Sequence, residues 1–135
     1  MLLEISIENF ILIEKLNLQF DNGLNILTGE TGAGKSILID AINVALGDKS
    51  RQEMIRAGSK KCVIQLIFVV ERKAVIDKLL ELGIDLDEDL LVISREIAGT
   101  GRSVVRINGR ITPLAVLKKV SGMLMDILLN NCALL

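Results

Sequence analysis

Residues 29–36, GETGAGKS, place three glycines and a lysine between two apolar segments of the chain. The short apolar run at residues 24–27 precedes this loop and predicts a strand, while the longer run at residues 36–46 follows it and predicts a helix. Only Asp40 and Asn43 interrupt the apolar residues of that helix, so we expect it to be buried. Asp40 then needs a hydrogen-bonding partner, expected to be neighbouring backbone, because a lone buried charge is costly.

This loop matches the pattern G-x-x-x-x-G-K-[ST] at every required position, which is typical of P-loops that bind the phosphates of nucleotides. Glycines let successive backbone amides converge on one anion, because they adopt positive φ at little cost and place no side chain in the way. The first turn of the following helix adds unpaired amides and the positive end of its dipole. We therefore predict a nucleotide-binding loop formed by Gly29, Glu30, Thr31, Gly32, Ala33, Gly34, Lys35 and Ser36.

Two side chains of the loop supply charge and a metal ligand. Lys35 is expected to bring its ammonium group to the β- and γ-phosphates, and Ser36 offers a hydroxyl oxygen to Mg²⁺, which prefers hard oxygen ligands. The alternative is a glycine-rich helix start that holds no ligand. Because three glycines would begin a helix poorly without an anion to hold, the nucleotide interpretation is favoured. The residues alone leave the choice between ATP and GTP open.

The composition restricts the other function classes. Half of the 135 residues are apolar and 24% are charged, as in a folded domain with a core of its own. Three Phe and no Tyr or Trp leave an aliphatic core and argue against stacking platforms for single-stranded nucleic acid. The net charge of −1 gives no overall attraction to nucleic acid or anionic lipid.

The absence of histidine excludes imidazole-based metal sites and catalysis. Two distant cysteines, Cys62 and Cys132, predict reduced structural thiols and neither a zinc site nor a disulfide framework. No apolar run has the length needed to span a bilayer, and the N-terminus lacks the basic region of a secretory signal. We therefore expect a cytoplasmic protein without a membrane partner.

The remaining pattern mixes strands and helices and predicts one α/β domain with antiparallel hairpins around the strand–loop–helix unit. Strands are predicted at residues 3–8, 15–20, 24–27, 62–70, 90–97 and 104–107, and helices at residues 36–46, at residues 74–82 and from residue 113 onward. The apolar run at residues 62–70 is nearly unbroken, which predicts a strand buried on both faces.

Turn and cap residues fix several boundaries of these elements. Gly47 is placed to end the first helix, and the Asn108-Gly109 pair predicts a tight hairpin. Thr112 is expected to cap the last helix and Pro113 to be its first residue.

Hydrolysis of a nucleotide needs an acid that holds the metal through water, usually at the end of an apolar strand. The runs at residues 67–71 and 123–126 end in Glu71 and Asp126. For both, the plainer interpretation is a strand end that meets solvent, so the catalytic residues stay unassigned. Glu30 is expected to be exposed and no base role follows from its position.

In five segments the chain resembles the N-terminal part of RecN, a family of bacterial DNA-repair ATPases with an SMC-like, ABC-type head. These segments occur in the same order and spacing and read MLLEISIENFILIEKLNLQF, GLNILTGETGAGKSILIDAI, IRAGS, SREI…GRSVVRINGR and DI. The resemblance runs from Met1 to about Asp126.

The resemblance implies the N-terminal lobe of a P-loop NTPase head, with antiparallel hairpins beside the P-loop strand and helix. In the family a long coiled coil and a C-terminal lobe follow, and two heads enclose ATP and Mg²⁺ between a P-loop and the signature motif of the other head. The implied role is recombinational repair of DNA double-strand breaks, with ATP, DNA and a second head as partners and the nucleoid as location.

Two departures from the family pattern bear on activity. The chain reaches Leu135 without a signature motif, and Asn130 stands near the place of a family glutamine that contacts the metal and the γ-phosphate. We therefore expect residues 1–127 to be an incomplete head lobe and residues 128–135 to be a divergent or truncated tail. Hydrolysis of ATP by this chain alone is not expected.

The resemblance also draws attention to residues outside the loop. Arg51 and Arg56 follow the P-loop helix, where SMC-like heads place an arginine near nucleotide or DNA, although a solvated basic loop explains them better. Asn9 and Phe10 lie where the first turn of the family approaches the base, and Phe10 is also a natural core residue.

Three further arginines flank the predicted hairpin. Arg102, Arg106 and Arg110 either contact a phosphate backbone or protect a sheet edge from aggregation, and the second account is at least as good.

Two other functions remain open from sequence. A small stand-alone P-loop kinase would need an arginine-rich lid and a complete second acidic motif, neither of which is evident. A non-catalytic remnant that binds nothing is compatible with the apolar run at residues 123–129.

Overall fold

The computed structural model describes residues 1–20 and 32–131, with residues 32–35 and 126–131 described by their backbone only. Within these residues a six-stranded antiparallel sheet has the order β2-β1-β3-β4-β5-β6. Its strands are β1 (Leu2–Phe10), β2 (Ile13–Gln19), β3 (Lys61–Val69), β4 (Leu90–Ala98), β5 (Ser103–Ile107) and β6 (Arg110–Ile111). The predicted strand at residues 24–27 lies outside the described residues.

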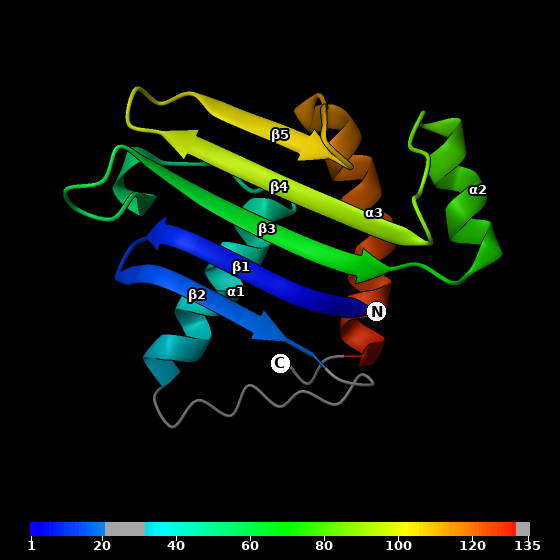
Figure 1. Cartoon of the computed structure of the whole chain (residues 1–135), viewed down its shortest axis with the longest axis horizontal. Helices are drawn as coiled ribbons and strands as arrows, with labels where there is room; N and C mark the ends of the chain where they lie inside the picture. The colour runs from blue at the N-terminus through cyan, green and yellow to red at the C-terminus, as the bar shows by residue number, and fades with distance from the viewer. Residues whose placement is uncertain (21–31, 132–135) are drawn as a thin grey trace.

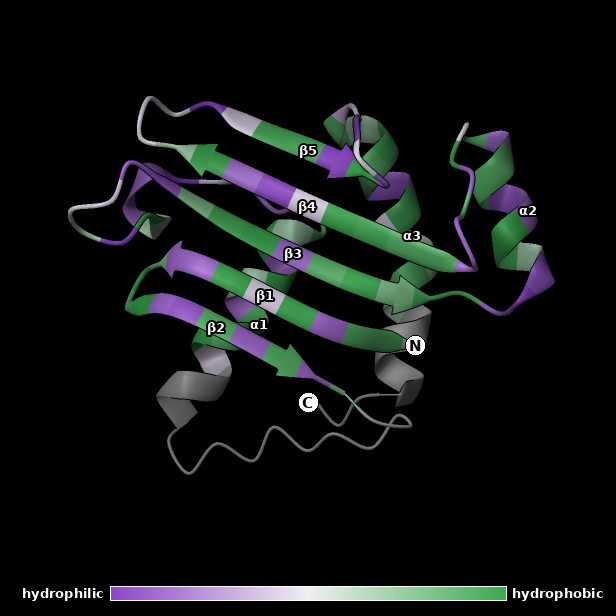
Figure 2. Ribbon diagram, viewed as in Figure 1, coloured by the Kyte–Doolittle hydropathy of each residue, from purple (hydrophilic) through white to green (hydrophobic). Residues whose placement is uncertain are grey.

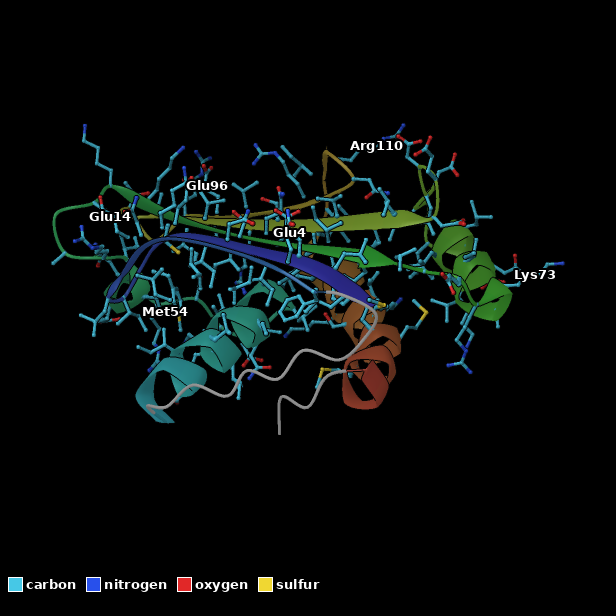
Figure 3. All side chains as sticks on the ribbon, turned by 60° about the horizontal axis from the view of Figure 1, so that its bottom comes forward. Glu4, Glu14, Met54, Lys73, Glu96 and Arg110 are labelled. Carbon is cyan, nitrogen blue, oxygen red and sulfur yellow. The ribbon has the colours of Figure 1, made fainter. Side chains whose placement is uncertain are left out.

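Two long helices cover one face of this sheet (Figures 1 and 3). They are α1 (Gly32–Ala45) and α3 (Leu114–Asn131), whereas α2 (Lys73–Glu81) lies beyond one end of the sheet. A short 3₁₀ turn, η1 (Gln52–Met54), follows α1. The side of the sheet turned away from α1 and α3, here called the open face, carries Glu4, Glu96 and Arg110 in Figure 3.

β1 and β2 alternate apolar and polar residues, whereas β3 and the first half of β4 are nearly continuously apolar (Figure 2). In β3 and β4 it is the burial that alternates, because helices cover one face of the sheet. In β3 the residues facing the helices, Cys62, Ile64, Leu66 and Phe68, are fully buried, whereas the intervening ones are half-buried. The prediction that this strand is buried on both faces was therefore wrong. An apolar run arises here because the half-buried open-face positions of β3 are also mostly aliphatic.

A bulge changes the alternation at the start of β1. The register of β1 against β3 shifts between Leu2 and Glu4, so Leu2 is buried together with Ile5 and Ile7 while Leu3 is only half-buried. In the sequence, Leu3, Ile5 and Ile7 alternate with polar residues, which predicts that all three lie on the same face of the strand. The bulge separates Leu3 from the other two. The hairpin turn is also tighter than predicted, because β1 extends to Phe10 and β2 begins at Ile13.

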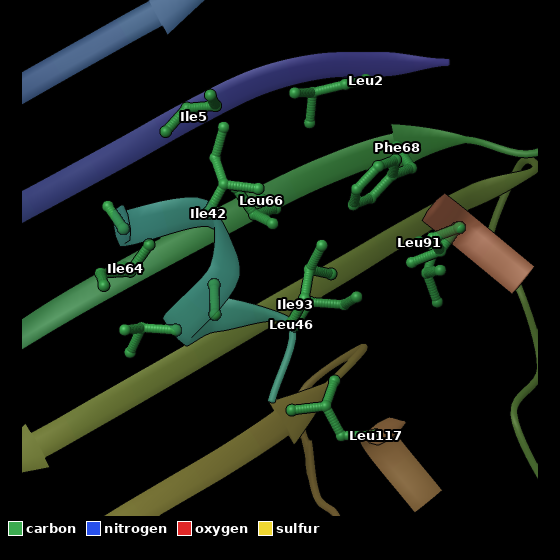
Figure 4. Packing of buried hydrophobic residues seen from close by; sticks show 14 of the residues in the cluster. Leu2, Ile5, Ile42, Leu46, Ile64, Leu66, Phe68, Leu91, Ile93 and Leu117 are labelled. Atoms are coloured by element: carbon green, nitrogen blue, oxygen red, sulfur yellow. The ribbon is translucent and has the colours of Figure 1, made fainter. Parts of the chain in front are cut away.

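The core joins α1 to the middle of the sheet (Figure 4). Ile42 of α1 and Leu46, which directly follows the helix, point toward Ile5, Leu66 and Ile93 on three neighbouring strands. Burial of side chains of this size is worth roughly 1.5–3 kcal/mol each, so the helix is held mainly by its apolar contacts.

The predicted end of α1 is confirmed. Gly47 has a φ of 123°, its amide donates to the Val44 carbonyl at 3.2 Å, and the Asp48 amide donates to the Asn43 carbonyl at 3.0 Å. This pair of bonds is the Schellman arrangement, in which a left-handed glycine turns the chain away from the helix.

The start and the length of α3 differ from prediction. The Thr112 hydroxyl donates to the Arg110 carbonyl instead of capping the helix, and Pro113 precedes the first helical residue, Leu114. Residues 123–126 belong to α3, so the interpretation of Asp126 as the end of a strand was wrong. The helix continues through residues 127 and 128, where the sequence predicted a boundary between the head lobe and a tail. That boundary stays a prediction.

The hairpin at Asn108 supports a stability prediction. Asn108 has a φ of 49°, its Oδ1 accepts from the Val92 amide at 2.7 Å, and its Nδ2 donates to the carbonyls of Asp85 (3.0 Å) and Leu90 (3.3 Å). We expect Asn108→Ala to lower the free energy of unfolding by about 2–3 kcal/mol, because a partly buried amide loses its acceptor and alanine disfavours positive φ. Urea denaturation measures this loss.

Asn108→Gly separates the two causes, because glycine tolerates the backbone angle but makes none of the side-chain bonds. It should recover about 1 kcal/mol of the loss. Equal stability of wild type and Asn108→Ala would contradict this account of the turn.

Candidate nucleotide-binding site

The described part of the glycine loop forms the beginning of α1. The helix starts at Gly32, so five of the eight predicted loop residues, Gly32, Ala33, Gly34, Lys35 and Ser36, belong to its first turns, and Ser36 is exposed. Gly29, Glu30 and Thr31 lie outside the described residues. The N-terminus of a helix presents unpaired amides and a positive dipole end to an anion.

A cleft of about 690 Å³ lies along the flank of α1, between the β1–β2 turn and the segment that follows the helix. It begins at Asp40, about 6 Å along the helix axis from Ser36 at 1.5 Å per residue. Its lining residues are Phe10, Ile11, Asp40, Asn43, Val44, Asp48, Lys49, Arg51, Glu53 and Met54. The cleft is therefore contiguous with the helix that carries the loop.

The position of Asp40 differs from the sequence-based expectation. Asp40 is exposed and lines the cleft, so the prediction of a buried carboxylate that needs a partner was wrong. The apolar run around it obscured that one side of α1 faces away from the sheet. Phe10 is fully buried, which confirms its place in the core, and it lines the cleft as well.

Backbone hydrogen bonds join the β1–β2 turn to the segment after α1. The Ile11 amide donates to the Met54 carbonyl and the Arg56 amide donates to the Asn9 carbonyl, both at 2.8 Å. Asn9 and Ile11 have φ values of 56° and 53°, and a β-branched residue such as Ile11 is strained there. These bonds hold the strained turn at one wall of the cleft.

The arginines after α1 lie at the surface. Arg51 is exposed and lines the cleft, and Arg56 forms a 4.0 Å ion pair with Glu14 on β2. An exposed pair of this length contributes little to stability, so the solvated interpretation fits Arg56. Arg102 and Arg110 are exposed and Arg106 is half-buried at the β5–β6 edge, on the far side of the sheet from β2.

The acids considered for catalysis are separated from the start of α1. Glu71 is exposed and follows β3 at the end of the sheet near α2, whereas α1 begins beneath β2 at the opposite side (Figure 1). Asp126 lies in α3. Among the described residues, no three His, Cys, Asp or Glu side chains gather as metal ligands, and no described helix has the length and apolar character that crossing a bilayer requires.

Arg95 is a buried charge that sequence analysis missed. It is 2% exposed on β4, its Nε donates to Ser103 Oγ at 3.0 Å, and its Nη1 donates to the carbonyls of Val44 (2.5 Å) and Asp48. Burial lowers the pKa of Arg95, while nearby Asp48 and Cys62 act in the opposite direction. A charged residue within the aliphatic alternation of β4 was the available signal.

Ser121 gives α1 a second polar attachment. It is the other buried polar residue among those described, and its hydroxyl donates to the Leu46 carbonyl. The last carbonyls of α1 are thus bonded by side chains from β4 and from α3.

Cys62 is a free, fully buried thiol on β3, as the sequence predicted. Burial raises its pKa from 9.0 to about 11, although Arg95 acts to lower it. Between these values the unfolded chain releases the thiol proton and the folded chain keeps it, so folding stability should fall as pH rises from 9 to 11. The expected loss is about 1 kcal/mol per pH unit over this range.

Cys62→Ala provides the reference for this pH effect, because the difference between the two proteins isolates the contribution of the thiol. The difference in unfolding free energy between wild type and Cys62→Ala, measured by denaturant titration at each pH, should change by about 2 kcal/mol from pH 9 to 11. A difference that does not depend on pH would contradict a neutral buried thiol.

Comparison with known proteins gives the chain a family context. A family model described as AAA domain matches residues 4–110. The DNA repair protein RecN of Halalkalibacterium halodurans is 44% identical over 128 residues, which cover 94% of this chain and 23% of that protein. RecN of Bacillus subtilis is 42% identical over 128 residues, covering 94% of this chain and 22% of the relative. The chain thus spans less than a quarter of the length of these relatives, and the predicted resemblance to RecN is confirmed.

Solved structures support the same fold. A structure from a study of ATP-driven dimerization and DNA-stimulated activation of SMC ATPases has a TM-score of 0.71 at 26% identity, covering 92% of this chain and 79% of that one. An Smc head bound to the C-winged helix domain of ScpA has a TM-score of 0.72 at 24% identity, covering 88% of this chain and 39% of that one. The predicted fold, the N-terminal lobe of an SMC-like ATPase head, is confirmed.

Proposed function

This chain belongs to the AAA domain family, and from that premise we propose that it is the ATP-binding lobe of a RecN-like protein that acts in recombinational repair of DNA double-strand breaks. The observation that carries the proposal is the start of α1 at Gly32, within the loop motif, together with the attachment of α1 to the sheet. Identity of 44% and 42% with two RecN proteins supports the choice of family role.

In this proposal the residues of the loop have distinct roles. Backbone amides of residues 29–36 surround the phosphates, and Lys35 adds a positive charge beside the β- and γ-phosphates. The hydroxyl of Ser36 is a ligand of Mg²⁺, which fits its exposed place in the first turns of α1. The bound ion would supply charge neutralisation to the triphosphate.

The cleft beside α1 is the proposed place for the nucleoside. It begins about 6 Å from Ser36 along the helix, and both apolar and charged residues line it. The cleft is lined both by the basic residues Lys49 and Arg51 and by the acidic residues Asp40, Asp48 and Glu53, so it has no strong charge of either sign. Such a mixture suits the neutral base and ribose better than it suits the phosphates.

Hydrolysis and DNA repair are proposed for a larger assembly. Of the two acids considered for catalysis, Glu71 lies at the other end of the sheet from the described start of α1 and Asp126 lies in α3. We therefore propose that turnover needs a C-terminal lobe and a second head, and that DNA is bound by that assembly. The cytoplasm, and within it the nucleoid, is the proposed location because the chromosome is the substrate of such repair.

Calorimetry with Mg·ATP, followed by a phosphate-release assay, tests the proposal. We expect ATP binding that depends on Mg²⁺ and no turnover by the isolated chain. Ser36→Ala should remove most of the Mg²⁺ dependence, whereas Ser94→Ala, on the open face of β4, should retain it. Turnover by the chain alone would favour a small kinase or phosphotransferase, and a folded chain that takes up no nucleotide would favour a non-catalytic remnant.

A further inference from the structure

We propose that Arg95 is a positioning residue that fixes the direction of α1 and thereby the geometry of the phosphate-binding loop at the other end of that helix. The inference rests on the proposed nucleotide-binding function. Its basis is the set of three bonds from one guanidinium group to the carbonyl of Val44 near the end of α1, to the carbonyl of Asp48 just after the helix, and to the hydroxyl of Ser103 on β5.

Arg95 is a charged residue on the face of β4 that is otherwise buried and aliphatic. The other residues on the same face of this strand, Leu91, Ile93 and Ile97, are buried and aliphatic. Burying a guanidinium among them is unfavourable unless its donors are paired. The carbonyls at the end of α1 provide such partners, and the negative end of the helix dipole favours a cation there.

An apolar side chain could fill the same space, but it would not direct the helix. The planar guanidinium holds its donors in a fixed fork, so its acceptors must lie in defined directions. Because one branch bonds the sheet residue Ser103 and the other bonds α1, the fork relates the helix end to the β4–β5 hairpin.

Two further contacts fix the same end of the helix. Ser121 of α3 donates to the Leu46 carbonyl, and the Gln52 side chain donates to the Gly99 carbonyl between β4 and β5. The segment after α1 is thus attached to the hairpin that also carries the partner of Arg95. Among these contacts only Arg95 bonds α1 directly to the sheet.

The length of α1 makes its direction important. From Val44 to Ser36 the helix extends about 12 Å at 1.5 Å per residue. A tilt of about 5° at the Arg95 end would move the first turn by about 1 Å, and binding constellations tolerate displacements of only about 0.5 Å. Loss of the fork should therefore weaken phosphate binding even though no residue of the loop is changed.

The test compares Mg·ATP binding by calorimetry for wild type, Arg95→Met and Leu91→Ala. Leu91 is buried on the same face of β4, close to α3 (Figure 4), so Leu91→Ala destabilises the core without removing a bond to α1. We expect the Kd of Arg95→Met to rise about tenfold, and that of Leu91→Ala to stay within about twofold of wild type, at a temperature where all three are folded. If Arg95→Met does not fold, Arg95→Lys replaces it, with an expected rise of about threefold because one ammonium cannot reproduce the fork.

A rise in Kd of less than twofold for the arginine variant would overturn the proposal, and so would an equal rise for Leu91→Ala. Hydrogen exchange measured without nucleotide tests the role of Arg95 separately from the proposed nucleotide-binding function. We expect the amides of residues 38–46 to exchange at least about tenfold faster in Arg95→Met than in Leu91→Ala. If wild type binds no ATP, the proposed function fails, and equal exchange rates in the two variants would then overturn the role of Arg95 independently.

Discussion

Replacing Lys35 with alanine is expected to weaken Mg·ATP binding at least about 100-fold, equivalent to about 2.7 kcal/mol. Lys35 belongs to the first turns of α1, where the loop motif requires a lysine. Its ammonium would contribute a full charge beside two phosphates that the helix amides reach only as dipoles. Loss of that charge leaves the repulsion among the phosphate oxygens uncompensated in the bound state.

Lys73→Ala is the matched control for this variant. Lys73 is exposed in the first turn of α2, which lies beyond the opposite end of the sheet (Figure 1). It removes the same side chain from the same kind of helix position, and its Kd should stay within about twofold of wild type. Equal weakening by both variants would point to overall charge and not to a site at α1.

Phe68→Ala is expected to produce the largest loss of stability, about 3–5 kcal/mol. Phe68 is fully buried on β3 and is paired in register with Leu2 on β1 and Leu91 on β4. Figure 4 shows its ring on the helix-facing side of the sheet near both residues. Removal of the ring leaves a cavity between three strands whose backbones are fixed by their hydrogen bonds, so little collapse is possible.

Ile67→Ala tests the assignment of the two sheet faces. Ile67 is the neighbour of Phe68 on β3, but it is half-buried on the open face. Its replacement should lower the unfolding free energy by only about 1–2 kcal/mol. Urea denaturation of wild type, Phe68→Ala and Ile67→Ala measures both losses. Similar losses for both variants would show that the open face is also covered in solution.

Sequence patterning predicted most of the local structure because its determinants are local. The alternation in β1 and β2, the glycine that ends α1 and the Asn108 turn each depend on a few neighbouring residues. The bulge at Leu3 was missed, since it is defined by pairing with a strand that lies about 60 residues away in sequence. The extent of α3 was missed for a different reason, because a short apolar run before Asp126 is equally compatible with a strand or a buried helix.

The candidate site was predictable only where it is a motif. The loop could be recognised because glycine, lysine and serine have fixed spacing, whereas the cleft is formed by the β1–β2 turn and the segment after α1, which come together in the fold. Arg95 lies 51 residues from Val44 in sequence, and nothing in its neighbours indicates that a helix end will supply acceptors. Asp40 was misplaced because periodicity does not reveal which side of an almost wholly apolar helix is left uncovered.

The pairing of β1 with β3 has a consequence for the order of assembly during translation. β1 and β3 are neighbours in the sheet, but residues 11–60 lie between them in the sequence. This intervening segment includes the loop motif and α1. A nascent chain that has emerged only as far as α1 has no partner for β1 on that side, and pairings between distant segments form slowly. The segment that carries the loop motif therefore acquires its supporting sheet only after β3 has emerged from the ribosome, and a ligand that assists folding could act only from that stage onward.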